Sequence, residues 1–176
     1  MAVQEIRLLG NPVLRTKCQT VKDFSSFELS HTIADLFDTL GDFRKRYGFG
    51  RGIASPQIGI TKRIVAIRPE HEALTLINPR ITGRSHQVMT LWDDCFSFPD
   101  IVVKVRRAAK VTVEYQDEKG RRHSLEAVGG LSELLQHEID HLDGVLAIDR
   151  AIDPTHIFLR SEMEKLNVSQ SPNVVL

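Results

Sequence analysis

The segment from Leu134 to Gly144 places two histidines four residues apart, with a glutamate directly after the first. Side chains at positions i and i+4 of a helix lie one turn apart on the same face, so His137 and His141 can bind one metal ion. Glu138 projects to the side of that face, where it can reach a water molecule without being a ligand itself. The H-E-x-x-H spacing therefore predicts a metal site for hydrolytic chemistry.

A metal site that performs hydrolysis needs a third protein ligand and one open position for water. A downstream glutamate could only be Glu162 or Glu164, and that spacing is short. A third histidine of the H-E-x-x-H-x-x-G-x-x-H type would occupy position 147, which is Ala147. The third ligand is therefore expected upstream, where Cys95 in the segment WDDCFSFP is the notable candidate in a chain with two cysteines.

Two helices are expected to flank the central part of the chain. Apolar residues at helical spacing predict a first helix that is capped by Ser25 or Ser26 and ends at Gly48. A loop dense in glycine follows at 48–59. A second helix is expected to open around Gly130 and to carry the H-E-x-x-H motif.

Short runs of β-forming residues occupy the region between these helices. The runs cover residues 63–68, 74–81, 87–92, 101–107, 110–116 and 122–128. DEKG at 117–120 predicts a hairpin turn, and a third short helix is predicted over 153–166 with Pro154 in its first turn. Strands between helices, without βα alternation, predict an α+β fold with mostly antiparallel sheets around the H-E-x-x-H helix. Residues 1–166 are expected to form one domain, and 167–176 a loose tail.

Composition narrows the class of protein. The chain has 176 residues and a formal net charge of zero, with 23 basic and 23 acidic residues. No run of like charges suggests a nucleic-acid surface, and no segment has the pattern of a secretory signal or a membrane span. Cys18 and Cys95 are far apart, which is typical of a reduced, cytoplasmic protein. We interpret Cys18 and the remaining histidines as structural or surface residues; these are His31, His71, His86, His123 and His156.

Three segments resemble, in order, the three motifs of the peptide deformylases. They are GRGIASPQIG (50–59), DDCFS (93–97) and QHEIDHLDG (136–144), against family motifs G-x-G-x-A-A-x-Q, E-G-C-L-S and Q-H-E-x-D-H. The resemblance extends to further segments and covers nearly all of 1–150. These further segments are LLGNPVLR (8–15), LINPRI (76–81) and DGVLAIDR (143–150).

The resemblance implies a reaction and a cofactor. The reaction is hydrolysis of the N-formyl group from new chains that begin with formyl-methionine. Cys95, His137 and His141 would bind one divalent ion, which is Fe(II) in the natural family members, with nickel, cobalt and zinc as alternatives. Glu138 would move the water proton to the leaving amine. Gln57 and the backbone N–H of Phe96 would stabilise the oxyanion.

The same resemblance implies substrate contacts. Gly50 and Gly52 would let the loop approach a peptide that pairs as an added strand, and Asp94, Glu133 and Leu134 would line its binding site. We also expect Asp140 to orient an imidazole N–H. Arg106 and Arg107 are interpreted as charges on the face of a strand.

Several positions depart from the family pattern. Asp93 and Asp94 replace a Glu-Gly pair, so the first carboxylate is one methylene shorter and the second position gains a charge. Phe96 replaces leucine and Ser55 an alanine, while Arg51 occupies a position that is commonly apolar.

A further departure lies on the predicted metal helix. Glu133 stands where the family has arginine or an aliphatic residue, near the pocket for the methionine side chain. Gly130 is expected to widen this pocket. A buried Glu133 carboxylate must be paired, protonated or wet, and we hypothesise a weakened or altered preference for methionine.

Two alternatives remain open from the sequence. One is a divergent, catalytically weak homologue that binds peptides, and the other is a metal-dependent peptidase on a different substrate. The product, formate or a new amino acid, distinguishes them. The expected partners are N-formylated nascent peptides, which the protein could meet at the ribosome. The protein itself is expected to be a monomer or a homodimer, and no nucleic-acid or membrane partner is expected.

Overall fold

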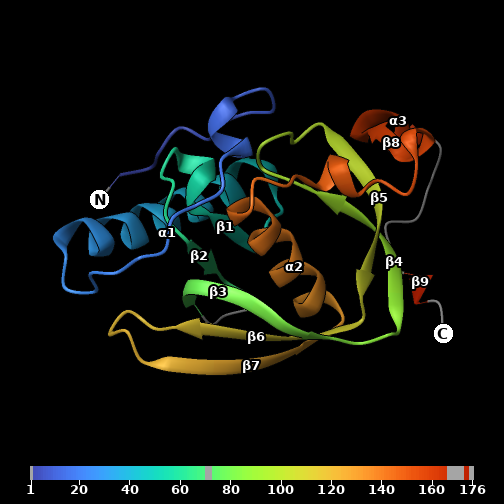
Figure 1. The fold of residues 1–176 in the computed structure, drawn as a ribbon. Coiled ribbons are helices and arrows are strands. Elements are labelled where there is room, and N and C mark those ends of the chain that lie inside the picture. Colours follow the sequence, from blue (N-terminus) through green and yellow to red (C-terminus); the bar gives the residue numbers. More distant parts are fainter. Residues whose placement is uncertain (1, 70–72, 166–172, 175–176) are drawn as a thin grey trace.

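The computed structural model describes residues 2–69, 73–165 and 173–174 and contains two antiparallel sheets arranged around one helix (Figure 1). The helices are α1 (Phe27–Tyr47), α2 (Gly130–Leu142) and α3 (Arg160–Lys165), with short 3-10 helices at Pro12–Arg15, Ser55–Ile58, Ala147–Arg150 and Pro154–His156. The strands are β1 (Gly52–Ala54), β2 (Ile64–Ile67), β3 (Leu74–Arg84), β4 (Val88–Asp94), β5 (Ile101–Ala108), β6 (Lys110–Gln116), β7 (Arg122–Val128), β8 (Ile157–Leu159) and β9 (Asn173–Val174). This architecture confirms the predicted α+β class.

The five-stranded sheet has the order β1-β2-β3-β6-β7. Val111 and Val113 are fully buried on one face of β6, as the alternation of apolar and polar residues predicted. The predicted hairpin joins β6 to β7, and the backbone N–H of Gly120 donates to Asp117 O at 2.9 Å. β1 lies within the segment predicted as a loop, where it pairs with β2 along the edge of the sheet.

The four-stranded sheet has the order β8-β5-β4-β9. The prediction of one helix over 153–166 is wrong in part, because this segment forms a 3-10 turn, then β8, then α3. The β-forming residues Ile157, Phe158 and Leu159 instead pair with β5. The predicted loose tail falls mostly outside the described residues, of which Asn173–Val174 form β9 against β4.

Helix α1 follows its predicted boundaries closely. The Ser26 side chain accepts a hydrogen bond from the Leu29 N–H, and Gly48 ends the helix with φ of 77°. Its apolar face, which includes Leu36 and Leu40, packs against β1 and β2.

Helix α2 lies between the two sheets (Figure 1). Leu135, Ile139 and Leu142 pack into the core of the five-stranded sheet. Gln136 fixes the helix to the end of β5, because its Oε1 accepts from Ala108 N at 3.1 Å and its Nε2 donates to Ala108 O at 3.0 Å. The H-E-x-x-H residues are thereby held by both sheets.

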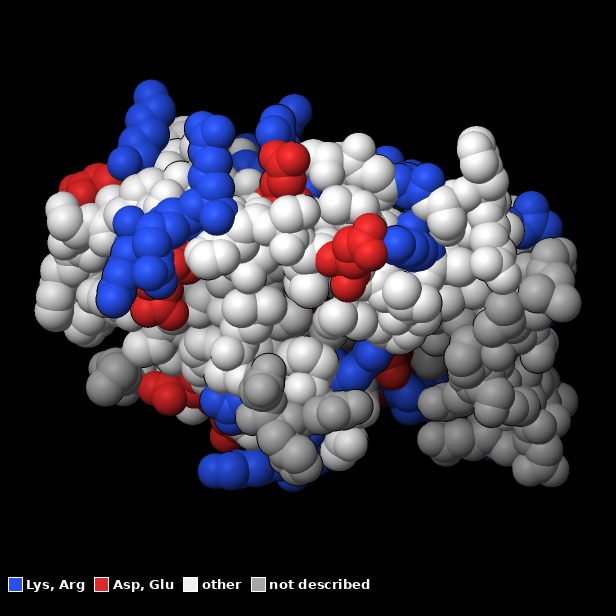
Figure 2. Space-filling model, turned by 90° about the horizontal axis from the view of Figure 1, so that it is seen from below, with Lys and Arg blue, Asp and Glu red and all other residues white. Residues whose placement is uncertain are grey.

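The surface carries mixed charge. On the face seen in Figure 2, Lys and Arg side chains lie beside Asp and Glu side chains. Among the described residues, no helix combines the length and the apolar character needed to cross a bilayer.

Candidate active site

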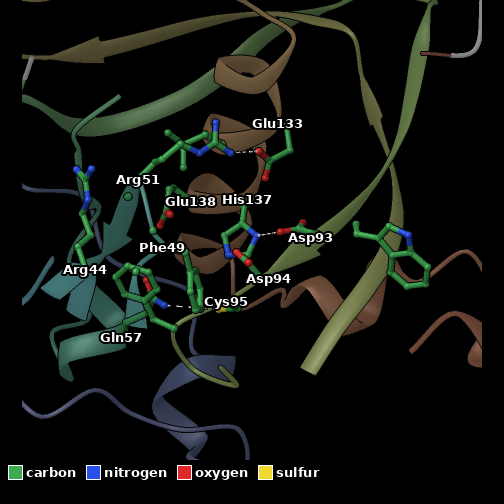
Figure 3. A pocket seen from close by; sticks show the side chains of 16 residues that line it. Arg44, Phe49, Arg51, Gln57, Asp93, Asp94, Cys95, Glu133, His137 and Glu138 are labelled. Carbon is green, nitrogen blue, oxygen red and sulfur yellow. Dashed lines mark hydrogen bonds and ion pairs between the residues drawn. The ribbon is translucent and has the colours of Figure 1, made fainter. Parts of the chain in front are cut away.

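A pocket of about 400 Å³ opens between α2, the loop before β1 and the end of β4 (Figure 3). All five residues predicted to contact substrate line this pocket, and they are Gly50, Gly52, Asp94, Glu133 and Leu134. The predicted catalytic residues also line it, and they are Gln57, Phe96 and Glu138. Residues that are far apart in sequence thus share one cavity, while their contact with a substrate stays a prediction.

Three potential metal-binding atoms converge beside this pocket. Cys95 Sγ lies 3.2 Å from His141 Nε2, which lies 3.2 Å from His137 Nε2. The three ligand atoms are all within 4.8 Å of one another, and the three residues are buried. Ligand atoms about 2.0–2.3 Å from one tetrahedral ion lie roughly 3.3–3.8 Å apart. The set of one sulfur and two imidazole nitrogens therefore fits a borderline divalent cation.

The two histidines differ in protonation. Burial, together with the neighbouring His137, lowers the pKa of His141 well below its usual value, so His141 is in the neutral form that binds a metal ion. Burial also acts to lower the pKa of His137, but the Asp93 carboxylate outweighs it and holds that pKa well above its usual value.

Asp93 orients the first histidine. Its Oδ1 lies 2.8 Å from His137 Nδ1, and its Oδ2 accepts from Arg107 Nη2 at 2.9 Å (Figure 3 shows the first contact). Burial alone would raise the pKa of the Asp93 carboxyl, but His137 and Arg107 hold it at about 2. The carboxylate therefore stays charged and leaves His137 Nε2 directed at the other two ligand atoms.

Two predictions about neighbouring residues are wrong. Asp140 does not contact an imidazole, and pairs instead with Arg107 and with Arg150. Arg107 is not a charge on an open strand face, since it is 4 % exposed and bridges Asp93 and Asp140. The sequence held a signal for this, because Arg107 shares the period-two face of β5 with the fully buried Val105. Arg106, on the other face, is exposed as predicted.

Glu138 is placed to act as a base. It is buried, and its Oε2 has no hydrogen-bond partner among the described residues. Burial raises the pKa of the Glu138 carboxyl to about 7, with His137 opposing and Glu133 reinforcing this shift. A carboxylate of this kind, open to a bound water, is suited to take up and return a proton near neutral pH.

Gln57 is held beside Cys95 by its own short helix. Its Oε1 accepts from Ala54 N at 2.8 Å, so the amide nitrogen points toward the site. Nε2 donates to Ser97 Oγ at 3.3 Å and lies 3.6 Å from Cys95 Sγ. The amide therefore presents an N–H donor beside the ligand cluster.

The two glycines of the first motif make close contacts inside the protein. A Cβ at Gly52 would lie 2.7 Å from Glu138 Oε1, and one at Gly50 would overlap the Phe96 ring. Gly50 also has φ of 106°, which residues with a side chain rarely adopt. These positions thus require glycine before any substrate is considered.

A residue that sequence reasoning missed lies at the pocket rim. Arg160 Nη2 lies 3.1 Å from Asp94 Oδ2, and its guanidinium lies over the Phe49 ring at 4.5 Å. It comes from the start of α3, far along the chain from both partners. No local pattern in the sequence could have indicated this contact. The charge that Asp94 adds is thereby paired.

The α+β fold and this set of potential ligand atoms are typical of a metal-dependent hydrolase. A sequence model described as polypeptide deformylase matches residues 3–156. The peptide deformylase of Heliobacterium modesticaldum is 41 % identical over 150 residues, which are 85 % of this chain and 95 % of that protein. The peptide deformylase of Dictyoglomus thermophilum is 35 % identical over 153 residues, covering 87 % of this chain and 95 % of its own length.

Solved structures agree with these sequence matches. The peptide deformylase of Thermotoga maritima superposes with a TM-score of 0.81 at 33 % identity, covering 87 % of this chain and 100 % of that one. A peptide deformylase from Synechococcus elongatus, solved in complex with actinonin, superposes with a TM-score of 0.81 at 34 % identity. The match covers 94 % of this chain and 87 % of that one. The chain belongs to the polypeptide deformylase family.

Proposed function

We propose that this chain is a metal-dependent hydrolase that removes the N-formyl group from formyl-methionine at the start of newly synthesised polypeptides. The observation that carries the proposal is the convergence of Cys95, His137 and His141 beside Glu138, whose buried Oε2 lacks a partner among the described residues. Membership in the deformylase family supports the substrate. A homologue that only binds peptides is not favoured, because nothing in a binding role requires this base beside a metal site.

Cys95, His137 and His141 would hold one divalent ion, and Fe(II) is proposed as the natural one, with nickel, cobalt and zinc as substitutes. When bound, such an ion polarises a carbonyl and lowers the pKa of water to about 7. Asp93 keeps His137 in the orientation that the site requires. Cys95 would bind such an ion as a thiolate and would contribute more charge to it than a neutral ligand.

The residues around the ligands supply proton transfer and charge stabilisation. Glu138 takes the proton from the attacking water and delivers it to the leaving amine. The Gln57 amide and the backbone N–H of Phe96 donate to the oxygen on which negative charge develops. The Phe43 ring stacks on the Phe96 ring at 3.7 Å and so holds the backbone that carries this donor.

The substrate is expected in extended form beside the glycine loop. Gly50, Gly52, Asp94 and Leu134 would contact its first residues. A nascent chain in the cytoplasm, met at the ribosome or after release, is the proposed partner, and the enzyme would act as a monomer or homodimer.

The test is product identity. Protein reconstituted anaerobically with Fe(II) or Ni(II) is incubated with formyl-Met-Ala-Ser, and both formate and free amino acids are quantified. Formate release that stops after chelation supports the proposal. A new free amino acid without formate would assign a peptidase, and neither product from metal-loaded protein would assign a binding protein.

A further inference from the structure

An ion pair forms one wall of the pocket. Arg51 Nη2 contacts Glu133 Oε2 (Figure 3). Arg51 Nη1 also donates to Gly130 O at 3.0 Å. Arg51 comes from the loop before β1 and Glu133 from the first turn of α2. Of the three states expected for a buried Glu133 carboxylate (paired, protonated or wet), the structure shows the paired one. The space expected at Gly130 is taken, because a Cβ there would lie 3.2 Å from Arg51 Nη1.

The pair lies directly beside the metal ligands. Glu133 precedes His137 by one helical turn, and a carboxylate oxygen of Glu133 lies within 4.8 Å of ligand atoms of Asp93 and His137. Leu134 lies on the adjacent position of the same turn and lines the pocket. The wall next to the reaction centre therefore combines one apolar side chain with an ion pair.

The position of the first substrate side chain follows from chain geometry and rests on the proposed function. The formyl carbon, the amide nitrogen and the first Cα are consecutive atoms. A formyl group at the ligand cluster therefore places the first side chain within one helical turn of His137. The turn of α2 that contains Glu133 and Leu134 borders this space.

The hydrogen-bond capacity of Arg51 is only partly used. A guanidinium has five N–H donors, and Arg51 makes its two side-chain contacts through Nη1 and Nη2. The Arg51 side chain is 46 % exposed and lines the pocket, while that of Glu133 is 9 % exposed, so Arg51 is the member of the pair that solvent or a substrate can reach. An apolar substrate side chain would displace water from the Arg51 N–H groups without giving them a new partner, which weakens binding. A side chain with a hydrogen-bond acceptor would take the place of that water.

We propose that Arg51 and Glu133 are a specificity-determining pair that makes the pocket favour first side chains ending in a hydrogen-bond acceptor over apolar side chains of similar length. Methionine, with its weak sulfur acceptor, falls between these two classes. The pair replaces the apolar wall that a purely aliphatic specificity would need.

The experiment compares formyl-Gln-Ala-Ser with formyl-norleucine-Ala-Ser, whose first side chains are similar in length and differ in polarity. The measured quantity is the ratio of their kcat/KM values for the wild type and for Arg51→Met with Glu133→Leu. Even a fully buried ion pair can often be replaced by apolar residues of similar volume without loss of stability, and this pair is only half buried, so the variant is expected to fold. The matched control is Arg80→Met with Glu114→Leu, which removes an exposed Arg–Glu pair between β3 and β6.

We expect the glutamine-to-norleucine ratio to fall at least about tenfold in the pocket variant and to stay unchanged in the control, because only the pocket variant loses a hydrogen bond between the substrate and a charged group. An unchanged ratio in the pocket variant would overturn the proposal. A second readout is peptide binding. Calorimetry gives the dissociation constants of unformylated Gln-Ala-Ser and norleucine-Ala-Ser for the metal-loaded proteins. If no peptide releases formate, the proposed function fails, and the ratio of dissociation constants still tests the pair.

Discussion

Asp93 Oδ1 lies 2.8 Å from His137 Nδ1, although Asp93 is one methylene shorter than the glutamate of the family motif. β4 brings the carboxylate to the metal helix, and Arg107 holds its other oxygen at 2.9 Å. Arg107 in turn pairs with Asp140 on α2, so the four side chains form one largely buried network that links β5 to His137. The shorter side chain therefore still reaches the histidine.

The first prediction concerns metal affinity. Asp93→Asn removes the negative charge that His137 Nδ1 faces, and we expect the dissociation constant for the divalent ion to rise by about 10- to 100-fold. Competition with a chromophoric chelator measures it, with circular dichroism to confirm folding. Asp100→Asn, an exposed position after β4, is the control and should leave the constant unchanged. Equal affinities for the two variants would mean that Asp93 does not tune the site.

Arg107 is expected to matter for stability rather than for chemistry. Arg107→Met leaves the buried carboxylate of Asp93 and the largely buried one of Asp140 without this cation, which should lower the free energy of unfolding by about 3–5 kcal/mol. Its neighbour supplies a matched control, because Arg106→Met changes an exposed side chain on the same strand and should cost less than about 0.5 kcal/mol. Urea denaturation measures the free energy of unfolding of both variants. Equal decreases for Arg107→Met and Arg106→Met would contradict a stabilising role of the Arg107 network.

The sequence was sufficient for the parts of the site that depend on local spacing. The i, i+4 relation of His137 and His141 defines a shared helix face, and motif order singled out Cys95, whose Sγ the structure places beside both imidazoles. Helix α1 was predicted to its ends because Ser26 and Gly48 are local cap signals. These features need no knowledge of which strands pair.

Contacts between distant segments could not be predicted in the same way. Arg160 meets Asp94 and Phe49 only because β8 pairs with β5, and the residues of β8 were assigned to a helix on the strength of Pro154. The partner of Glu133 was likewise unknown. Burial of Glu133 left pairing, protonation and hydration open, and only the position of the loop that carries Arg51 decided among them. In both cases the missing information was sheet pairing or loop position.

Gly52 tests the packing around the base. Gly52→Ala places a Cβ 2.7 Å from Glu138 Oε1 and 3.0 Å from Leu134 Cδ1, so the carboxylate must move. A misplacement near 1 Å can lower kcat on the order of 10²-fold. Gly41→Ala in α1 meets nothing within 4 Å and should keep full activity while gaining about 0.5–1 kcal/mol of stability. Steady-state formate release and thermal unfolding are measured for both variants. An undiminished kcat for Gly52→Ala would contradict the claim that a side chain at this position displaces the Glu138 carboxylate.

The most direct test of the central claim is metal content and formate release measured on the same preparation of Glu138→Gln. Because Glu138 moves protons and is not a ligand, the variant should bind one divalent ion per chain as the wild type does, while kcat on formyl-Met-Ala-Ser falls by about 10²–10⁴-fold or more. Retained activity would contradict the assignment of Glu138 as the base. Loss of the ion together with activity would show that Glu138 holds the metal instead.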